Sequence, residues 1–248
     1  PFPTGIRFRI WPNIWPALDL TVGFWSGGGH GKSHAAGGRQ NFEFPAFNDL
    51  PVAVDTVLDK TQQSKIHWVS HSGGGHLPLM YLARNPENQN RFAGLVTIGA
   101  QATDGAMGIR YKLRSAALWA VTMLLGQTPK FVVSMGSEGE PTCLLAQWAV
   151  WNLRRQWLGK DGFDYLSGLG RIDIPALIMA GGNDAIAPVS GCEKVFNALG
   201  SKDKSWTVCS RAEGFSTNFT HGQLIRGNAA RAEVFPKIGE WIRQQYDL

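Results

Sequence analysis

The chain has 248 residues, enough for one large domain, and 44% of them are hydrophobic while 17% are charged. Lysine and arginine outnumber aspartate and glutamate by 24 to 19, but the basic residues are dispersed, which argues against nucleic-acid binding. The best apolar run, residues 116–126, is too short to span a bilayer. The first residues lack the pattern of a signal peptide and the three cysteines are scattered. We therefore expect a cytoplasmic protein with reduced thiols and no stable membrane insertion.

Strand-like and helix-like segments alternate along most of the chain, which indicates an α/β protein with a mainly parallel sheet. The predicted strands are 18–25, 65–70, 91–100, 174–182 and 204–211. Outside residues 101–168, the predicted helices are 48–61, 74–85, 189–200 and 228–245.

Residues 101–168 break this alternation, because they hold two helical patterns, near 107–126 and 141–159, and no clear strand. We therefore predict a core domain formed by residues 1–100 and 169–248, with residues 101–168 inserted as a helical cap.

The pentapeptide SGGGH occurs twice, and its first copy, within SGGGHGKS (26–33), resembles a phosphate-binding loop after a strand. A phosphate-binding loop requires a helix directly behind it. Gly37, Gly38 and Pro45 stand where that helix should run, so the sequence favours a glycine-rich turn without a nucleotide. His30 and His34 lack a third clustered ligand, and we predict no metal site.

The second copy lies in SHSGGGH (70–76), between a predicted strand and a predicted helix, as a nucleophile elbow requires. That turn is so sharp that the residues two before and two after the nucleophile must be small, and Ser70 and Gly74 are small. The turn would expose the Ser72 hydroxyl and direct the Gly73 N–H toward a developing oxyanion. A glycine-rich helix start without chemistry is the alternative interpretation.

A serine nucleophile needs a histidine base and a carboxylate. In proteins with a nucleophile elbow, their order along the chain is serine, acid, histidine. Asp184 follows the strand 174–182, and His221 follows the strand 204–211. His221 is the only histidine beyond Asp184. Asp104, after the strand 91–100, is the alternative acid.

These motifs together resemble the α/β-hydrolase superfamily, specifically its bacterial serine esterases and lipases with a helical cap. GGGHGKS is similar to the turn after the fourth strand of that fold, VSHSGGG to the elbow, and IMAGGNDAIAP to the acid loop. The tail AEGFSTNFTHGQLIRGNAARAEVFPKIGEWI is similar to the histidine loop and closing helix. The resemblance implies the roles already inferred for Ser72, Asp184 and His221.

The chain departs from the family pattern at its start, where the family carries further strands and a His-Gly motif that completes the oxyanion hole. We expect a sheet short at this edge, with N-terminal strands missing, and a second oxyanion donor at Gly5 or Ile6.

The expected function is hydrolysis of carboxylic esters with lipophilic acyl chains, by an acyl-enzyme mechanism that requires no cofactor. His71, Trp119, Trp148 and Trp151 are the candidate substrate-binding residues, although most cap tryptophans are expected to pack the cap onto the core. The sequence indicates no particular oligomeric state. A thioesterase, amidase or peptidase with the same triad, or a non-catalytic binding protein of this fold, remains compatible with it.

Overall fold

The computed structural model describes residues 41–105 and 142–245, together with Arg9–Ile10, Gly23–Phe24 and the single positions Leu113, Ala117 and Ala120. Statements about the fold and the site refer to these residues.

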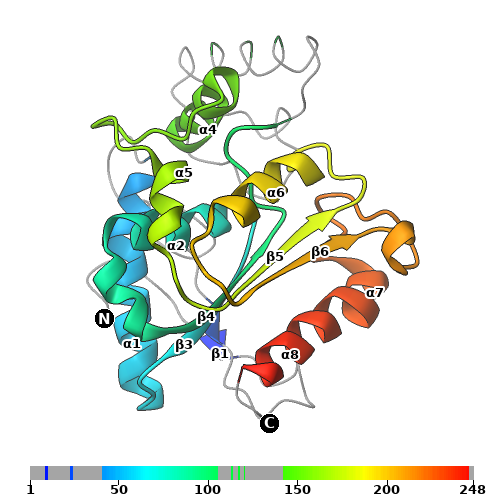
Figure 1. The fold of residues 1–248 in the computed structure, drawn as a ribbon, viewed down its shortest axis with the longest axis horizontal. Helices are drawn as coiled ribbons and strands as arrows, with labels where there is room; N and C mark the ends of the chain where they lie inside the picture. The colour runs from blue at the N-terminus through cyan, green and yellow to red at the C-terminus, as the bar shows by residue number, and fades with distance from the viewer. Residues whose placement is uncertain are drawn as a thin grey trace.

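A parallel sheet of four strands, in the order β3-β4-β5-β6, forms the centre of the molecule (Figure 1). The strands are β3 (Ile66–His71), β4 (Phe92–Ile98), β5 (Ala176–Gly181) and β6 (Lys204–Cys209). The prediction of these four strands is confirmed, with boundaries that differ by at most a few residues. The strand predicted over 18–25 is described only at β2 (Gly23–Phe24), which pairs antiparallel with β1 (Arg9–Ile10) in a separate sheet.

Helices cover both faces of the sheet, as a parallel sheet requires (Figure 1). The helices on one face are α1 (Leu50–Thr61), α2 (Gly73–Arg84) and α6 (Val189–Ala198). The opposite face carries α7 (Gly227–Ala229), a π-helical turn (Ala230–Val234) and α8 (Phe235–Gln244). A second π-helical turn, Pro45–Asp49, runs directly into α1, so the helical segment predicted over 48–61 begins at Pro45.

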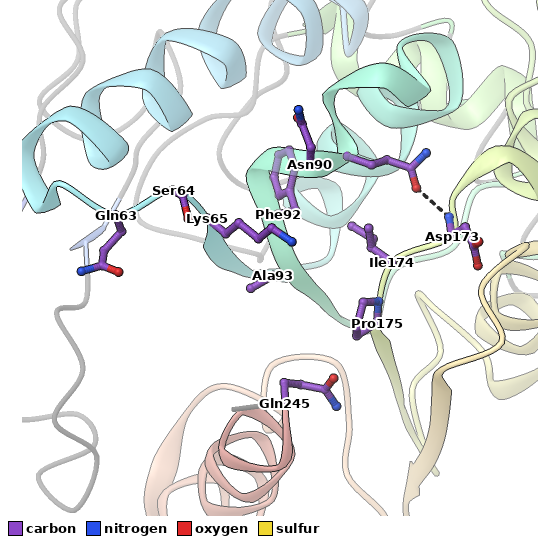
Figure 2. Close-up of a pocket in the computed structure, with 11 residues that line it drawn as sticks. Gln63, Ser64, Lys65, Asn90, Phe92, Ala93, Asp173, Ile174, Pro175 and Gln245 are labelled. Atoms are coloured by element: carbon purple, nitrogen blue, oxygen red, sulfur yellow. Dashed lines mark hydrogen bonds between the residues drawn. The ribbon is translucent and has the colours of Figure 1, made fainter. Parts of the chain in front are cut away.

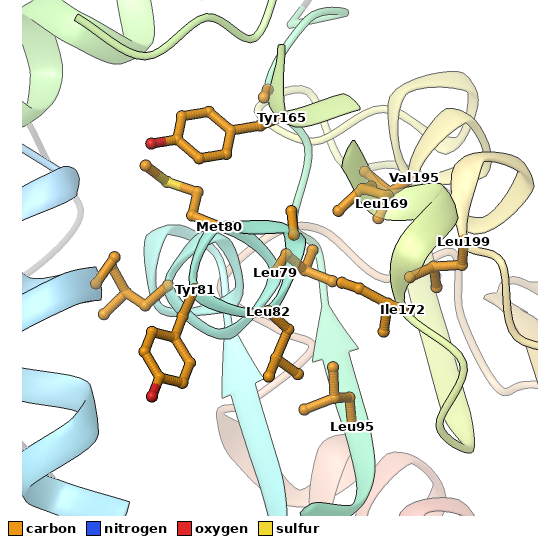
Figure 3. Packing of buried hydrophobic residues seen from close by; sticks show 14 of the residues in the cluster. Leu79, Met80, Tyr81, Leu82, Leu95, Tyr165, Leu169, Ile172, Val195 and Leu199 are labelled. Carbon is orange, nitrogen blue, oxygen red and sulfur yellow. The ribbon is translucent and has the colours of Figure 1, made fainter. Parts of the chain in front are cut away.

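Two hydrophobic clusters hold these layers together, one on each face of the sheet. On the α2 face, Leu79, Met80 and Leu82 are fully buried. Leu82 points toward Leu95 of β4, whereas Met80 points toward Tyr165 (Figure 3). On the other face, Trp241 of α8 packs in the second cluster. Because burial of each large apolar side chain contributes roughly 1.5–3 kcal/mol, these two layers fix the sheet and the loops at its ends.

The connection from β4 to β5 holds the helices α4 (Thr142–Arg154) and α5 (Tyr165–Gly168). Its described residues contain no strand, only an isolated bridge between Leu158 and Asp164. Most of the first predicted cap helix, 107–126, lies outside the described residues. The division into core and cap therefore stays a prediction, but α4 is tied to the predicted core because the Phe42 main-chain N–H donates to Gln147 Oε1 at 2.8 Å.

Within the described part of the chain, no helix combines the length and the apolar character that crossing a membrane requires.

Candidate active site

Ser72 lies in a sharp turn between β3 and α2, at the carboxyl edge of the sheet. Its backbone adopts φ 53° and ψ −128°, a conformation that non-glycine residues rarely occupy and that costs about 1–3 kcal/mol. A Cβ placed on Gly74 would lie 3.9 Å from the Cβ of Ser70, so the small residues on either side of Ser72 do face each other. The local structure is therefore the strained strand-to-helix turn that a nucleophile elbow requires.

The structure brings Ser72, Asp184 and His221 together, although they lie on loops that follow three different strands. The His221 Nε2 atom is 2.8 Å from the Ser72 hydroxyl, and the His221 Nδ1 atom is 2.7 Å from Asp184 Oδ2. Since a carboxylate only accepts hydrogen bonds, Nδ1 carries the proton and Nε2 is free to accept the Ser72 proton. This arrangement allows the Ser72 hydroxyl to transfer its proton to His221 Nε2, while Asp184 orients the histidine ring.

The Asp184 carboxylate is fixed by its own loop. Its Oδ1 atom accepts hydrogen bonds from the Ile186 and Ala187 main-chain N–H groups, both at 2.8 Å, while Oδ2 contacts His221. The Asp184 side chain is completely buried, so these donors replace its lost hydration. The carboxylate is held in one orientation toward His221.

Backbone hydrogen bonds also tie these loops to the sheet and to each other. The Ser72 N–H donates to the Ile98 carbonyl at 2.9 Å, which continues the β3–β4 pairing past the end of β3. The Asn183 N–H donates to the Phe219 carbonyl at 3.0 Å and joins the acid loop to the histidine loop.

The predicted alternative acid, Asp104, has a different partner. Its Oδ2 atom lies 2.5 Å from Lys194 Nζ, and its side chain is buried. The geometry therefore places Asp184, and not Asp104, beside His221.

Gly73 is the first residue of α2, so its N–H has no acceptor within the helix and adds to the positive end of the helix dipole. This is the position that the sequence predicts for an oxyanion donor. Gly5 and Ile6, the predicted second donors, lie outside the described residues.

The other predicted site residues take different places. The His71 ring lies against the His221 ring, with centroids 4.5 Å apart. Trp148 is partly buried at the Gln101 carbonyl, and Trp151 is 2% exposed, with its N–H donated to Leu158 O and its ring against Trp157. The packing role expected for most cap tryptophans therefore applies to Trp151. Trp119, His30 and His34 lie outside the described residues.

Sequence reasoning missed Gly99. We predicted a strand as far as residue 100, but β4 ends at Ile98 and Gly99 turns away with φ +58°. A Cβ at Gly99 would lie 3.2 Å from Asp184 Oδ2 and 3.3 Å from His221 Nδ1. Gly99 thus leaves the space that the acid–histidine pair fills, and its position just after a strand at the carboxyl edge was the available signal.

A hollow of about 700 Å³ lies at the opposite, amino edge of the sheet (Figure 2). Lys65 before β3, Asp173 before β5 and Gln245 after α8 are among the residues that line it. Because it is remote from Ser72, it has no part in the chemistry of the triad.

The remaining nucleophilic and metal-binding side chains of the described residues form no second site. No group of three or more histidine, cysteine or acidic residues there could hold a metal ion. Cys192 and Cys209 are buried free thiols, and burial raises the pKa of each, so neither is a ready nucleophile.

Comparisons with known proteins agree with this architecture. The family model described as "alpha/beta hydrolase fold" matches residues 28–132, and no curated protein matches the chain. Among solved structures, the chain is similar to a Paleococcus ferrophilus monoacylglycerol lipase, with 19% identity, a TM-score of 0.62, and coverage of 94% of this chain and 88% of that one.

Two esterases are similar to the same degree. The thermophilic esterase from Thermogutta terrifontis has 17% identity and a TM-score of 0.61, covering 99% of this chain and 88% of that one. The Exiguobacterium antarcticum esterase has 17% identity and a TM-score of 0.60, covering 98% of this chain and 89% of that one. At these identities the likeness concerns the fold.

Proposed function

We propose that this chain, which has the α/β-hydrolase fold, hydrolyses carboxylic esters through a covalent acyl-enzyme on Ser72. One observation carries the proposal: an unbroken hydrogen-bonded series from the Ser72 hydroxyl through His221 to the buried Asp184, at 2.8 and 2.7 Å. A non-catalytic relative would have no need for a strained serine at hydrogen-bond distance from a base.

Acylation begins when His221 Nε2 accepts the Ser72 proton as the serine oxygen attacks the ester carbonyl carbon. Asp184 stabilises the imidazolium that forms. Collapse of the tetrahedral intermediate breaks the bond to the alcohol oxygen, which takes the proton from His221 and leaves. Water, activated by His221, then attacks the acyl-enzyme and releases the acid and free Ser72 by the same path. No step of this mechanism requires a cofactor.

The oxyanion of each tetrahedral intermediate receives a hydrogen bond from the Gly73 N–H at the positive end of α2. A second donor would come from Gly5 or Ile6, as the family resemblance implies. Removal of one such donor typically lowers the rate by about 10²–10³, so both positions matter to the mechanism.

A lipophilic acyl chain is the substrate that fits the cap best. The cap sequence is rich in tryptophan and leucine, including Trp119 and Trp148, and Leu153 of α4 keeps an exposed apolar side chain. The structural relatives include proteins named monoacylglycerol lipase and esterase. We therefore propose a carboxylesterase or lipase rather than an enzyme for charged substrates.

The test is hydrolysis of p-nitrophenyl esters from acetyl to palmitoyl, with Ser72→Ala beside the wild type. Ser70→Ala is the matched control, because Ser70 lies in the same motif but its hydroxyl bonds the Val96 carbonyl. We expect activity in the wild type and in Ser70→Ala, its loss in Ser72→Ala, and fluorophosphonate labelling of Ser72. If the wild type shows neither hydrolysis nor labelling, the proposal is wrong and a non-catalytic binding protein of this fold becomes the better interpretation. A preference for thioesters over matched esters would indicate a thioesterase instead.

A further inference from the structure

His71 is the last residue of β3, directly before Ser72, and its side chain lies against the proposed base. The ring centroids of His71 and His221 are 4.5 Å apart, and the ring planes are inclined by 44°. One imidazole thus comes from the rigid sheet and the other from the loop after β6.

A hydrogen bond joins the same two residues. The His71 Nε2 atom is 3.1 Å from the main-chain oxygen of His221. A carbonyl oxygen only accepts hydrogen bonds, so Nε2 of His71 must carry the proton. His71 therefore donates a hydrogen bond to the main chain of His221, whose side chain contacts Ser72.

Resting on the function proposed above, we propose that His71 is a positioning residue: its Nε2–H holds the backbone of His221, and through it the imidazole, in line with Ser72. His71 need not touch the substrate in this role. The histidine loop is otherwise ordered by local bonds, such as that of the Thr220 hydroxyl to Gln223 Oε1 at 2.9 Å, and by the bond from the Asn183 N–H to the Phe219 carbonyl. The bond from His71 adds the link between this loop and the strand that carries Ser72.

The charge state of His71 suits this role. Its pKa is lowered to about 4, chiefly by burial and then by the charges of His221 and Arg226, while the bond to the His221 backbone and the charge of Asp184 act in the opposite direction. At neutral pH His71 is therefore an uncharged donor. It can position His221 without placing a second positive charge beside the imidazolium that forms during the reaction.

Two variants separate the hydrogen bond from the ring contact. His71→Gln keeps an amide N–H near the position of Nε2 but removes the ring, whereas His71→Phe keeps a ring and removes the donor. His71→Leu serves as a second donor-less variant if phenylalanine does not pack.

The experiment measures kcat, KM and the pH profile on p-nitrophenyl butyrate, together with the thermal midpoint of each variant. Because small displacements of catalytic groups lower rates steeply, we expect kcat to fall about 10- to 100-fold in His71→Phe, with KM changed less than about threefold. We expect His71→Gln to recover most of this loss and the acid limb of the pH profile to move only in the donor-less variants. Equal kcat in His71→Phe and the wild type, per folded protein, would overturn the proposal.

A second readout does not depend on activity. The Nδ1 proton of His221, hydrogen-bonded to Asp184, should give a low-field signal in the NMR spectrum, and His221→Gln should abolish it. We expect this signal to broaden or shift in His71→Phe and to persist in His71→Gln. An unchanged signal in His71→Phe would refute the positioning role even if the wild type proved inactive, in which case the proposed esterase function would fail separately.

Discussion

Replacement of Gly99 by alanine tests the geometry of the acid–histidine pair most directly. Gly99 has φ +58°, and an L-residue in the left-handed region costs about 1–2 kcal/mol. The new Cβ would also lie 3.2 Å from Asp184 Oδ2 and 3.3 Å from His221 Nδ1, so both atoms must move by a few tenths of an ångström. Since a misplacement of about 1 Å lowers rates about 100-fold, we expect kcat to fall about tenfold in Gly99→Ala.

Gly162→Ala is the matched control, because Gly162 has φ +85° but a Cβ there would have no atom within 4 Å apart from those of its chain neighbours. Both variants should lose about 1–2 kcal/mol of unfolding free energy in urea. Only Gly99→Ala should lose activity per folded molecule. If the two variants hydrolyse p-nitrophenyl butyrate equally fast, the contact between Gly99 and the acid–histidine pair has no catalytic consequence and the reasoning is wrong.

Three further results are expected. Asp184→Asn should lower kcat by up to about 10⁴, because the amide favours the wrong tautomer of His221. Asp104→Asn should retain kcat and lose only stability, because it breaks the ion pair with Lys194. Comparable losses of kcat in both variants would contradict the assignment of the acid. Burial lowers the pKa of His76 from 6.5 to about 4, so between these pH values the unfolded chain binds more protons than the folded one. The unfolding free energy should therefore decrease as the pH is lowered from 6.5 to about 4. Thermal melts of His76→Gln should show a smaller decrease than those of the wild type. Leu79→Ala should cost about 2–5 kcal/mol in urea unfolding, since Leu79 is fully buried; a loss under about 1 kcal/mol would mean that the α2 layer repacks freely.

The sequence predicted the four strands of the sheet and the residues that meet at its carboxyl edge because both depend on local patterns. Apolar runs bounded by turn residues mark β3 to β6, and the order of Ser72, Asp184 and His221 follows from the order of the strands. Parallel strands bring their carboxyl ends to one edge, so the loops that carry these residues had to be neighbours.

Contacts that depend on distant packing could not be predicted in the same way. Nothing in the pattern around Trp151 distinguishes a pocket wall from the buried position it takes against Trp157. The contact of His71 with His221 joins residues far apart in the chain, and the tight fit of Gly99 depends on two other loops. These contacts form only when the paired strands bring the loops at the carboxyl edge of the sheet next to one another.

The backbone hydrogen bonds that tie the catalytic loops to the sheet have a consequence for how the molecule should respond to heat. Ser72 is bonded to the end of β4, the acid and histidine loops are bonded to each other, and the N–H groups of Gly182 and Phe219 both donate to the Cys209 carbonyl at the end of β6. Opening of these loops therefore breaks hydrogen bonds at the end of the sheet. Regions joined in this way open as one cooperative unit. Activity and sheet structure should therefore disappear over the same temperature interval, and a preparation that still contains the intact sheet should still contain an aligned triad.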